Sequence, residues 1–451
     1  MFSLVKKSIV ALLCLAMVFS LVACDNSGEE NNGGNGNSGG SVNLSEYDLD
    51  SEAVLNSMPE DLKGTTIKFL NWYDPMQREE GAVIKAFEQK SGCEVEIIIK
   101  QYGSEYNEAL ASSVALGDAP DVIRMKAPLI ANLKALQPIS NTGFDFSDKA
   151  WDKGTQETYS VNGVQYGVNL KYSPFFLPTL MFYNTKTIEE YGIEDPYELW
   201  KEDKWTWDKL DEICSEWVKM SEENMGVAVL PYGDAPAMTK GVDWVTYDGS
   251  KYTVDLTNKD ILDAWTYTLE NKKNRIFCEP QDGFDKATPT TLFAAMDATA
   301  IQSSSQYYSK TRRRGDLGVV PYPTWTTKDE YYVPMMEDLA YGVPIGAKNA
   351  KAVPYFLAYY LDFSNYDTTG TNFFFSEQAK ECYMDLMSMP NRFLNTSSYI
   401  MSSEGGYNNV MIFRTVDPAQ LTPHLQEREY IINDQITQVN DALSKLDGQK
   451  K

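Results

Sequence analysis

Histidine is almost absent from this sequence, since His424, in Pro423-His424-Leu425, is the only one among 451 residues. Ser-His-Asp and Cys-His catalysis, zinc held by histidine and histidine general bases would all depend on this single imidazole. A lone histidine in a proline-flanked stretch is typical of a surface or packing residue. The sequence therefore gives no support to histidine-dependent chemistry.

Cysteine is scarce, and the six cysteines form no CxxC pair and no zinc spacing. Beyond residue 24 we predict buried free thiols, with one or two disulfides as the alternative in an oxidising habitat, for Cys93, Cys214, Cys278 and Cys382. No Walker loop or GxGxxG turn lies between a strand and a helix. We therefore predict neither a metal site nor a cofactor.

Positive charge is also in short supply. The net charge of −24 argues against nucleic acid and anionic lipid as partners. Solubility of an exported protein accounts for this acidity, which gives no evidence of a cationic substrate. Carboxylates are numerous enough for some to lie at glycosidase-like separations by chance, so a surface glycosidase or lyase with two carboxylates stays open as an alternative.

The N-terminal segment carries the clearest signal. Lys6 and Lys7 precede a mostly apolar run over residues 9–22, shorter than the roughly 20 apolar residues of a membrane-spanning helix. This pattern predicts a secretory signal peptide over residues 1–23, with an uncleaved anchor helix as the alternative. Removal of the two lysines takes the net charge from −24 to −26.

The quartet Leu21-Val22-Ala23-Cys24 resembles the lipobox of bacterial lipoproteins. The resemblance implies cleavage before Cys24 and a diacylglycerol on its sulfur. The diacylglycerol matters because stable membrane anchoring takes more than one acyl chain. Residues 25–41 are nearly all Asn, Gly, Ser, Asp and Glu, a composition that cannot bury apolar surface. We therefore predict a lipidated cysteine and disordered tether over residues 24–59, with membrane contact through the lipid, on the extracellular face of a bacterial cell membrane.

Residues 64–123 alternate strands with helices. Residues 65–70 read as a strand, and residues 95–99, VEIII, as a strand buried on both faces of a parallel sheet. Helices are expected before Gly92, which suits a C-terminal cap, and from Ser104 onward. This order predicts a doubly wound α/β lobe, whose ligands approach the carboxyl ends of the strands near residues 71–73 and 124–126.

Several segments, taken in order, resemble family 1 of the bacterial extracellular solute-binding proteins, the sugar-binding class that serves ABC importers. They are residues 86–95 (AFEQKSGCEV), 115–122 (ALGDAPDV), 162–168 (NGVQYGV), 205–210 (WTWDKL) and 342–349 (GVPIGAKN). The resemblance covers most of residues 60–365. It departs from the family pattern where a glycine and a methionine of the family are Met296 and Ala300.

About 410 residues follow the polar stretch, too many for one core, which favours two lobes. The resemblance implies an α/β, two-lobed, periplasmic-binding-protein-like fold of type II, each lobe a doubly wound sheet flanked by helices, joined by a hinge. Lobe one would hold residues 60–170 and 343–395, and lobe two residues 171–342 and 396–451. The chain would cross near residues 169–171, 339–344 and Asn395.

The same resemblance implies a monomeric, membrane-tethered receptor that is not an enzyme. It would bind a carbohydrate, an oligosaccharide by expectation, between two closing lobes and deliver it to ABC permease subunits. Sugar rings pack on aromatic faces, while amides, carboxylates and guanidinium groups satisfy their hydroxyls. The predicted ligand-binding residues are Asn71, Trp72, Tyr73, Arg124, Lys126, Asn169, Tyr172, Tyr232, Asp243, Trp244, Gln306, Tyr307 and Asp338.

Each aromatic candidate has a competing interpretation as a core residue. An aromatic side chain is more often buried in the hydrophobic core than exposed as a surface on which a sugar ring stacks. Trp207, Trp217 and Trp265 lie on helical apolar stripes and are predicted to be core. The alternative functions are the carboxylate glycosidase and a solute-binding sensor for a non-sugar ligand, since a fold does not fix its ligand.

Overall fold

The structure is a computed structural model. The residues that it describes are 49–126, 130–228, 234–278, 283–286, 289–303, 305–337, 339–368, 373–389, 391–394, 396–397 and 417–448. The predicted signal peptide, Cys24, Tyr232, Asp338 and Asn395 lie outside them. Within these ranges, no helix has both the length and the apolar character that a membrane span requires.

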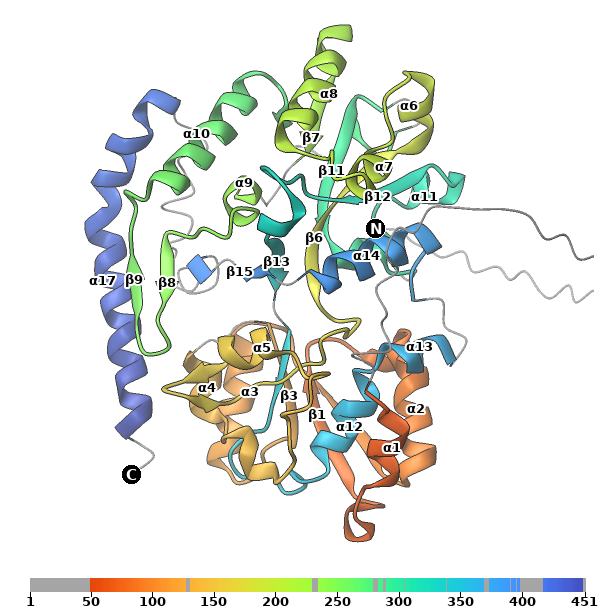
Figure 1. Cartoon of the computed structure of the whole chain (residues 1–451). Helices are drawn as coiled ribbons and strands as arrows, with labels where there is room; N and C mark the ends of the chain where they lie inside the picture. The colour runs from red at the N-terminus through yellow and green to blue at the C-terminus, as the bar shows by residue number, and fades with distance from the viewer. Residues whose placement is uncertain are drawn as a thin grey trace, which may run out of the picture. The chain divides into compact units, whose positions relative to one another are not determined.

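The smaller of two main sheets has the strand order β14–β3–β1–β2 (Figure 1). Its strands are β1 (Thr66–Asn71), β2 (Glu94–Ile99), β3 (Val122–Met125) and β14 (Ala340–Gly342). The first three are parallel, and β14 runs antiparallel to β3. Two helices connect them, α2 (Glu80–Ser91) and α3 (Ser104–Ala115). The predicted strand–helix alternation is confirmed, and Gly92 ends α2 with a left-handed φ of 71°.

The prediction that residues 95–99 are buried on both faces is wrong. Their strand, β2, lies at the edge of the sheet and pairs only with β1 among the described strands. Ile99 is 49% exposed as a result. A short apolar run fits an edge strand and a central strand equally well, because its neighbours are set by the order of strands in the sheet.

The larger sheet has the order β10–β7–β11–β6–β13–β15, with β12 also paired to β6 (Figure 1). Its strands are β6 (Leu177–Asn184), β7 (Met225–Ala228), β10 (Phe277–Cys278), β11 (Thr291–Asp297), β12 (Leu317–Pro321), β13 (Val333–Glu337) and β15 (Arg392–Leu394). β6 is buried along its whole length because β11, β12 and β13 all pair with it. The two small hairpins are β4 (Ser160–Val161) with β5 (Val164–Gln165), and β8 (Val245–Tyr247) with β9 (Tyr252–Val254).

The remaining helices pack around these sheets. They are α1 (Ser51–Asn56), α4 (Ile130–Ala135), α5 (Lys153–Thr158), α6 (Thr185–Glu190), α7 (Pro196–Lys201), α8 (Trp207–Met220), α9 (Ala235–Met238), α10 (Lys259–Lys273), α11 (Ser309–Arg314), α12 (Val353–Tyr360), α13 (Phe363–Thr368), α14 (Glu377–Ser388) and α17 (Leu421–Gly448). The 3₁₀ segments are Glu60–Leu62, Pro75–Gln77, Ile139–Thr142, Ala298–Ile301, Lys328–Glu330 and Pro418–Gln420. Figure 1 shows α17 running along β9 and α10, which it contacts.

The sequence around the N-terminus of α8 determines where this helix begins and which of its faces is buried. Thr206 accepts a hydrogen bond from the Lys209 amide at 3.2 Å and so caps the helix. One face of α8 is buried, with Leu210, Cys214 and Trp217 on it. The predictions that Trp207, Trp217 and Trp265 are core, and that Cys93, Cys214, Cys278 and Cys382 are buried free thiols, are confirmed.

The folded part begins earlier than expected. The predicted tether extends to residue 59, but α1 already packs against α12, with Leu55 and Met58 in the core. Asp50 caps α1 by accepting a hydrogen bond from the Ala53 amide. The disorder-prone composition of residues 25–41 does not continue here, because apolar residues return at helical spacing.

Within the residues that the structure describes, the chain passes three times between the two sheets. Val168 still pairs with Tyr341 of β14, and the chain enters the larger sheet at β6. It returns between β13 and β14. The third passage follows α13, because α13 packs on α2 whereas α14 packs on β12. This passage therefore precedes the predicted crossing at Asn395, in a part of the chain where the family resemblance is weak.

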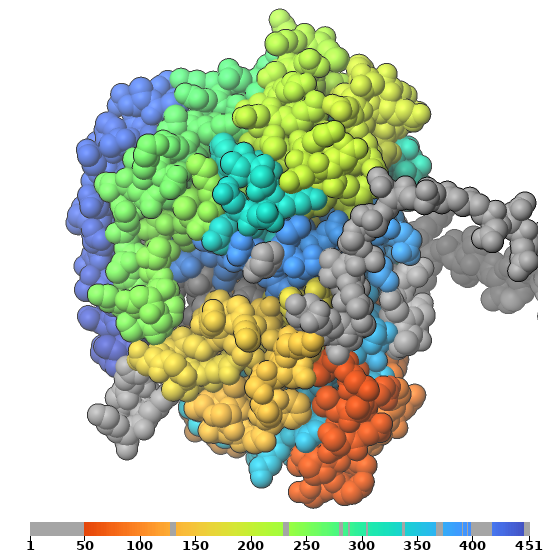
Figure 2. Space-filling model, in the orientation of Figure 1, coloured from red at the N-terminus to blue at the C-terminus, as the bar shows by residue number. Residues whose placement is uncertain are grey.

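The position of the third passage bears on the predicted lobe boundaries. α14 and β15 fall within residues 343–395, expected in lobe one, yet they pack with β12 and β13 of the larger sheet. Figure 2 shows blue segments of this region between the red-to-yellow residues below and the green residues above. These contacts favour a return to the larger sheet before α14, and the other boundaries stay predictions.

Candidate functional site

The carboxyl ends of β1 and β3 bring two aromatic rings and two cations together. Trp72 and Tyr73 follow β1, Arg124 lies in β3, and Lys126 follows it. The Arg124 guanidinium lies 5.1 Å from the centroid of each of the two rings, and the Lys126 ammonium lies 5.3 Å from that of Trp72. Neighbouring parallel strands end at the same edge of a sheet, so residues about 50 positions apart meet there.

Arg124 is enclosed by aromatic rings, with only 4% of its surface exposed. Its guanidinium also lies 4.7 Å from the ring centroid of Phe175, in the segment that leads into β6. Contact with ring faces offsets part of the cost of removing this charge from water. The arginine is thereby held in one place at the centre of the site.

Two hydrogen bonds in series hold Tyr73 between Glu80 and Arg124. The Tyr73 hydroxyl donates to Glu80 Oε1 at 2.5 Å, and Arg124 Nη1 donates to the Tyr73 oxygen. Burial raises the pKa of the Glu80 carboxyl above its ordinary value and likewise raises the pKa of Tyr73. Glu80 has the only carboxylate among these residues, and its Oε1 already accepts the hydrogen bond from the Tyr73 hydroxyl.

These residues line a cavity of about 230 Å³ that receives side chains from both sheets. This volume is slightly below the roughly 300–1,000 Å³ of typical ligand pockets. Its lining residues are Trp72, Tyr73, Arg78, Glu80, Arg124, Lys126, Phe175, Leu177, Thr299, Gln302 and Leu339. The first six come from the smaller-sheet side, whereas Leu177 belongs to β6 and Thr299 and Gln302 follow β11. A ligand here would touch both halves of the fold.

The chain passages lie directly beside this cavity. Asn169 is fully buried, and its Nδ2 donates a hydrogen bond of 2.6 Å to the Leu339 carbonyl. Two of the three connections are thus joined by a side chain next to the cavity, because Leu339 also lines it. Movement of one sheet relative to the other would change the shape of the cavity.

Comparison with known proteins agrees with this architecture. The family model described as bacterial extracellular solute-binding protein matches residues 74–362. This chain belongs to that family. No curated protein matches the chain.

Solved structures of solute-binding proteins share the two-lobed type II fold. An ABC substrate-binding protein from Listeria monocytogenes in complex with cycloalternan is 13% identical, with a TM-score of 0.55, over 85% of this chain and 99% of that one. A solute-binding protein from Thermotoga lettingae with alpha-D-tagatose is 17% identical, with a TM-score of 0.55, over 84% and 100%. One from Staphylococcus aureus with maltose is 13% identical, with a TM-score of 0.58, over 83% and 97%.

Four predicted ligand-binding residues of this solute-binding protein lie in the cavity: Trp72, Tyr73, Arg124 and Lys126. The other described candidates do not line it, namely Asn71, Asn169, Tyr172, Asp243, Trp244, Gln306 and Tyr307. Tyr232 and Asp338 lie outside the described residues.

Burial explains the position of most of these outlying candidates. Asn71 is fully buried, and its Oδ1 accepts from the Trp72 amide, which orients the tryptophan. Asp243 accepts a hydrogen bond of 2.9 Å from the Ser397 amide, and burial raises its pKa to about 6. Trp244 is 2% exposed and belongs to a hydrophobic cluster with residues of β9 and α10. Tyr307, by contrast, is 48% exposed.

Seven cavity residues were missed: Arg78, Glu80, Phe175, Leu177, Thr299, Gln302 and Leu339. Arg78 and Glu80 stand at the start of α2 and carry no pattern that marks a ligand site. Phe175 and Leu177 lie in an unusually long apolar stretch, residues 172–180, which was the one available signal. Thr299 and Gln302 fall beside the departure from the family pattern.

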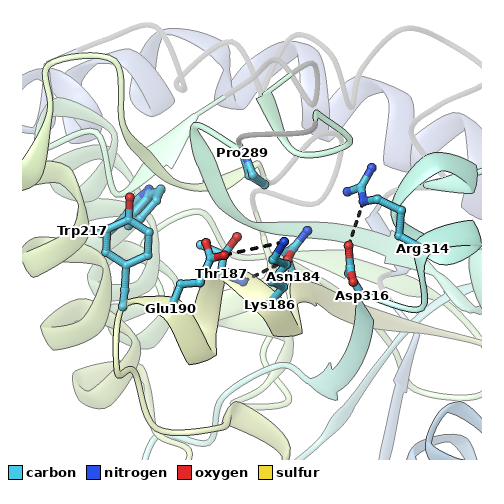
Figure 3. A pocket seen from close by; sticks show the side chains of 9 residues that line it. Asn184, Lys186, Thr187, Glu190, Trp217, Pro289, Arg314 and Asp316 are labelled. Carbon is cyan, nitrogen blue, oxygen red and sulfur yellow. Dashed lines mark hydrogen bonds and ion pairs between the residues drawn. The ribbon is translucent and has the colours of Figure 1, made fainter.

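A second cavity, of about 390 Å³, lies between α6, α8 and α11 of the larger-sheet half (Figure 3). Tyr191 and Trp217 form its aromatic side, with ring centroids 5.0 Å apart. On its polar side, Lys186 Nζ lies 3.7 Å from Glu190 Oε1. Arg314 Nε forms an ion pair of 2.7 Å with Asp316 Oδ2. Both cations of this second cavity therefore have carboxylate partners. The described residues contain no cluster of His, Cys, Asp or Glu suited to a metal ion.

Proposed function

We propose that this protein is a membrane-tethered extracellular receptor that binds a carbohydrate between its two lobes and delivers it to the permease of an ABC transporter. The observation that carries the proposal is the cavity itself, where Trp72 and Tyr73 stand beside Arg124 and Lys126 and face residues of the other sheet. Membership of the solute-binding family supplies the receptor role. The neighbours crystallised with cycloalternan, tagatose and maltose support a sugar as the ligand.

The cavity has both kinds of group that a sugar needs. Aromatic faces pack against the C–H side of a pyranose, and Trp72 provides the larger of them. Sugar hydroxyls lose water on entry and need hydrogen-bond partners, and the lining includes guanidinium, ammonium and amide groups at Arg78, Lys126 and Gln302. Because the partners come from both sheets, bound sugar would favour the closed arrangement of the lobes.

The test is a thermal-shift screen of the full-length protein, in a detergent without a sugar headgroup, against mono- and oligosaccharides. A sugar at 100 times its dissociation constant should stabilise the fold by about 2.7 kcal/mol, which shifts the melting temperature measurably. The bound sugar should be recovered intact by mass spectrometry. Silence across the panel would contradict the sugar receptor, and a cleaved oligosaccharide would favour the carboxylate glycosidase instead.

The proposal includes lipidation of Cys24, which rests on the lipobox resemblance and on the polar stretch that follows. A diacylated cysteine would hold the receptor beside the permease, so that released sugar does not diffuse away. Replacing Cys24 with alanine should abolish incorporation of labelled fatty acid into the protein, because the resemblance places the acyl chains on the modified cysteine. Labelling of cells that express each variant checks this, with Cys14→Ala as the matched control that should be labelled as the unaltered protein is. Equal labelling of both variants would contradict lipidation at Cys24.

A further inference from the structure

The charge of the cavity between the sheets is opposite in sign to that of the chain. Its described lining contains Arg78, Arg124 and Lys126 against one carboxylate, Glu80, whereas the whole chain has a net charge of −24. A cavity drawn at random from so acidic a surface would be acidic. We propose that the sugar taken by this site is an acidic one, with a carboxylate such as that of a hexuronate unit, an inference that rests on the receptor function proposed above.

Glu80 does not neutralise the arginines by direct contact. Its carboxylate accepts the Tyr73 hydroxyl at 2.5 Å and is almost fully buried. No ion pair of the described residues joins Glu80 to Arg78 or to Arg124. Its negative charge acts on Arg124 and Arg78 through space, but a single carboxylate balances only one of these two arginines, so positive charge remains to meet a ligand.

Arg124 has an unfilled hydrogen-bonding position. Its Nε is buried and has no hydrogen-bond partner among the described residues. A buried cation whose donors are incompletely paired is costly, and aromatic faces offset only part of that cost. A ligand carboxylate supplies what is missing, since guanidinium and carboxylate form two parallel charge-assisted hydrogen bonds.

Arg78 lies at the mouth of the same cavity, where its guanidinium is 4.1 Å from the ring centroid of Tyr73. It is exposed, so it can meet an approaching anion before that anion loses its water. In the second cavity Lys186 and Arg314 each have a carboxylate partner. Arg78 and Arg124, by contrast, form no ion pair with a carboxylate among the described residues. These two arginines therefore distinguish the site that both sheets line.

The experiment compares acidic oligosaccharides with neutral twins. Di- to tetrasaccharides of galacturonate, glucuronate and mannuronate, and the same compounds after carboxyl reduction, are titrated into the full-length protein by calorimetry. In at least one pair the acidic member should bind about tenfold or more tightly than its twin. Its affinity alone should fall as sodium chloride is raised.

Matched variants connect that preference to the cavity. Arg78→Gln should weaken the acidic member by a clearly larger factor than the neutral twin, because the exposed Arg78 offers a hydrogen bond to both but a charge interaction to the acid alone. Arg313→Gln, the same substitution at an exposed arginine outside the cavity, should change neither. Neutral twins that bind as tightly as the acids would overturn this inference and leave the receptor function standing. Failure of these pairs and of the neutral sugar screen to bind would overturn both.

Discussion

Replacing Trp72 with alanine is expected to weaken sugar binding by roughly 30- to 150-fold, or about 2–3 kcal/mol. The tryptophan is the largest aromatic surface in the cavity between the sheets, and its ring lies beside Arg124 and Lys126. Its loss removes the platform for the sugar ring and loosens the packing that holds both cations. Because Trp72 is half-buried at the end of β1, the fold should persist in the variant.

Calorimetry with the sugar found in the screen measures this effect, and circular dichroism shows that the variant is folded. Tyr191→Ala is the matched control, since Tyr191 is an aromatic residue of the second cavity and is 50% exposed. It should bind the sugar as the unaltered protein does. Normal binding by the Trp72 variant, with loss in the Tyr191 variant, would place the sugar in the second cavity instead.

Replacing Trp244 with alanine is expected to lower the free energy of unfolding by about 3–5 kcal/mol. The sequence predicted a ligand contact here, but the indole is 2% exposed in a hydrophobic cluster that also contains Tyr252 and Leu256. Truncation leaves a cavity that the surrounding β-hairpin and α10 cannot fill without moving. The sugar affinity of the folded variant should stay unchanged, because Trp244 does not line the cavity.

Urea unfolding of the full-length protein, followed by circular dichroism, measures the loss. Trp244→Phe serves as the comparison, since it keeps an aromatic ring in the cluster and should lose less than half as much stability. Sugar affinity is then titrated at a temperature where both variants are folded. Unaltered stability combined with lost affinity would show that Trp244 contacts the ligand, as the sequence analysis predicted.

Four of the residues predicted to bind ligand line the cavity between the sheets, and their role in binding stays a prediction. Trp72, Tyr73, Arg124 and Lys126 were chosen because they follow or end predicted parallel strands, and the cavity contains all four. The rule applies within a single sheet, whose geometry follows from the order of strands and helices. No such rule connects these residues to Phe175, Thr299 or Gln302, which reach the cavity from the other side.

One pattern can suit two environments, as at residues 95–99, where the prediction of burial on both faces is wrong. Trp244 is buried, and its predicted ligand contact stays a prediction. The exposure of both segments depends on their neighbours in space rather than on their own spacing. The third chain passage was placed too late because the family resemblance weakens there and local patterning does not tell which sheet a helix will cover. Packing partners decide such cases.

The sequence by itself determined the family, the α/β character of both halves, the cap of α8 and the strand-end position of the first four site residues. These features depend on contacts between residues near in the chain, or on motifs that keep their order. The tertiary structure alone decided that Arg78 and Glu80 join Trp72, that residues of β6 and η6 (Ala298–Ile301) complete the cavity, and that Asn169 ties two connections together. Long-range packing brings those side chains within reach of one another, and no local pattern records it.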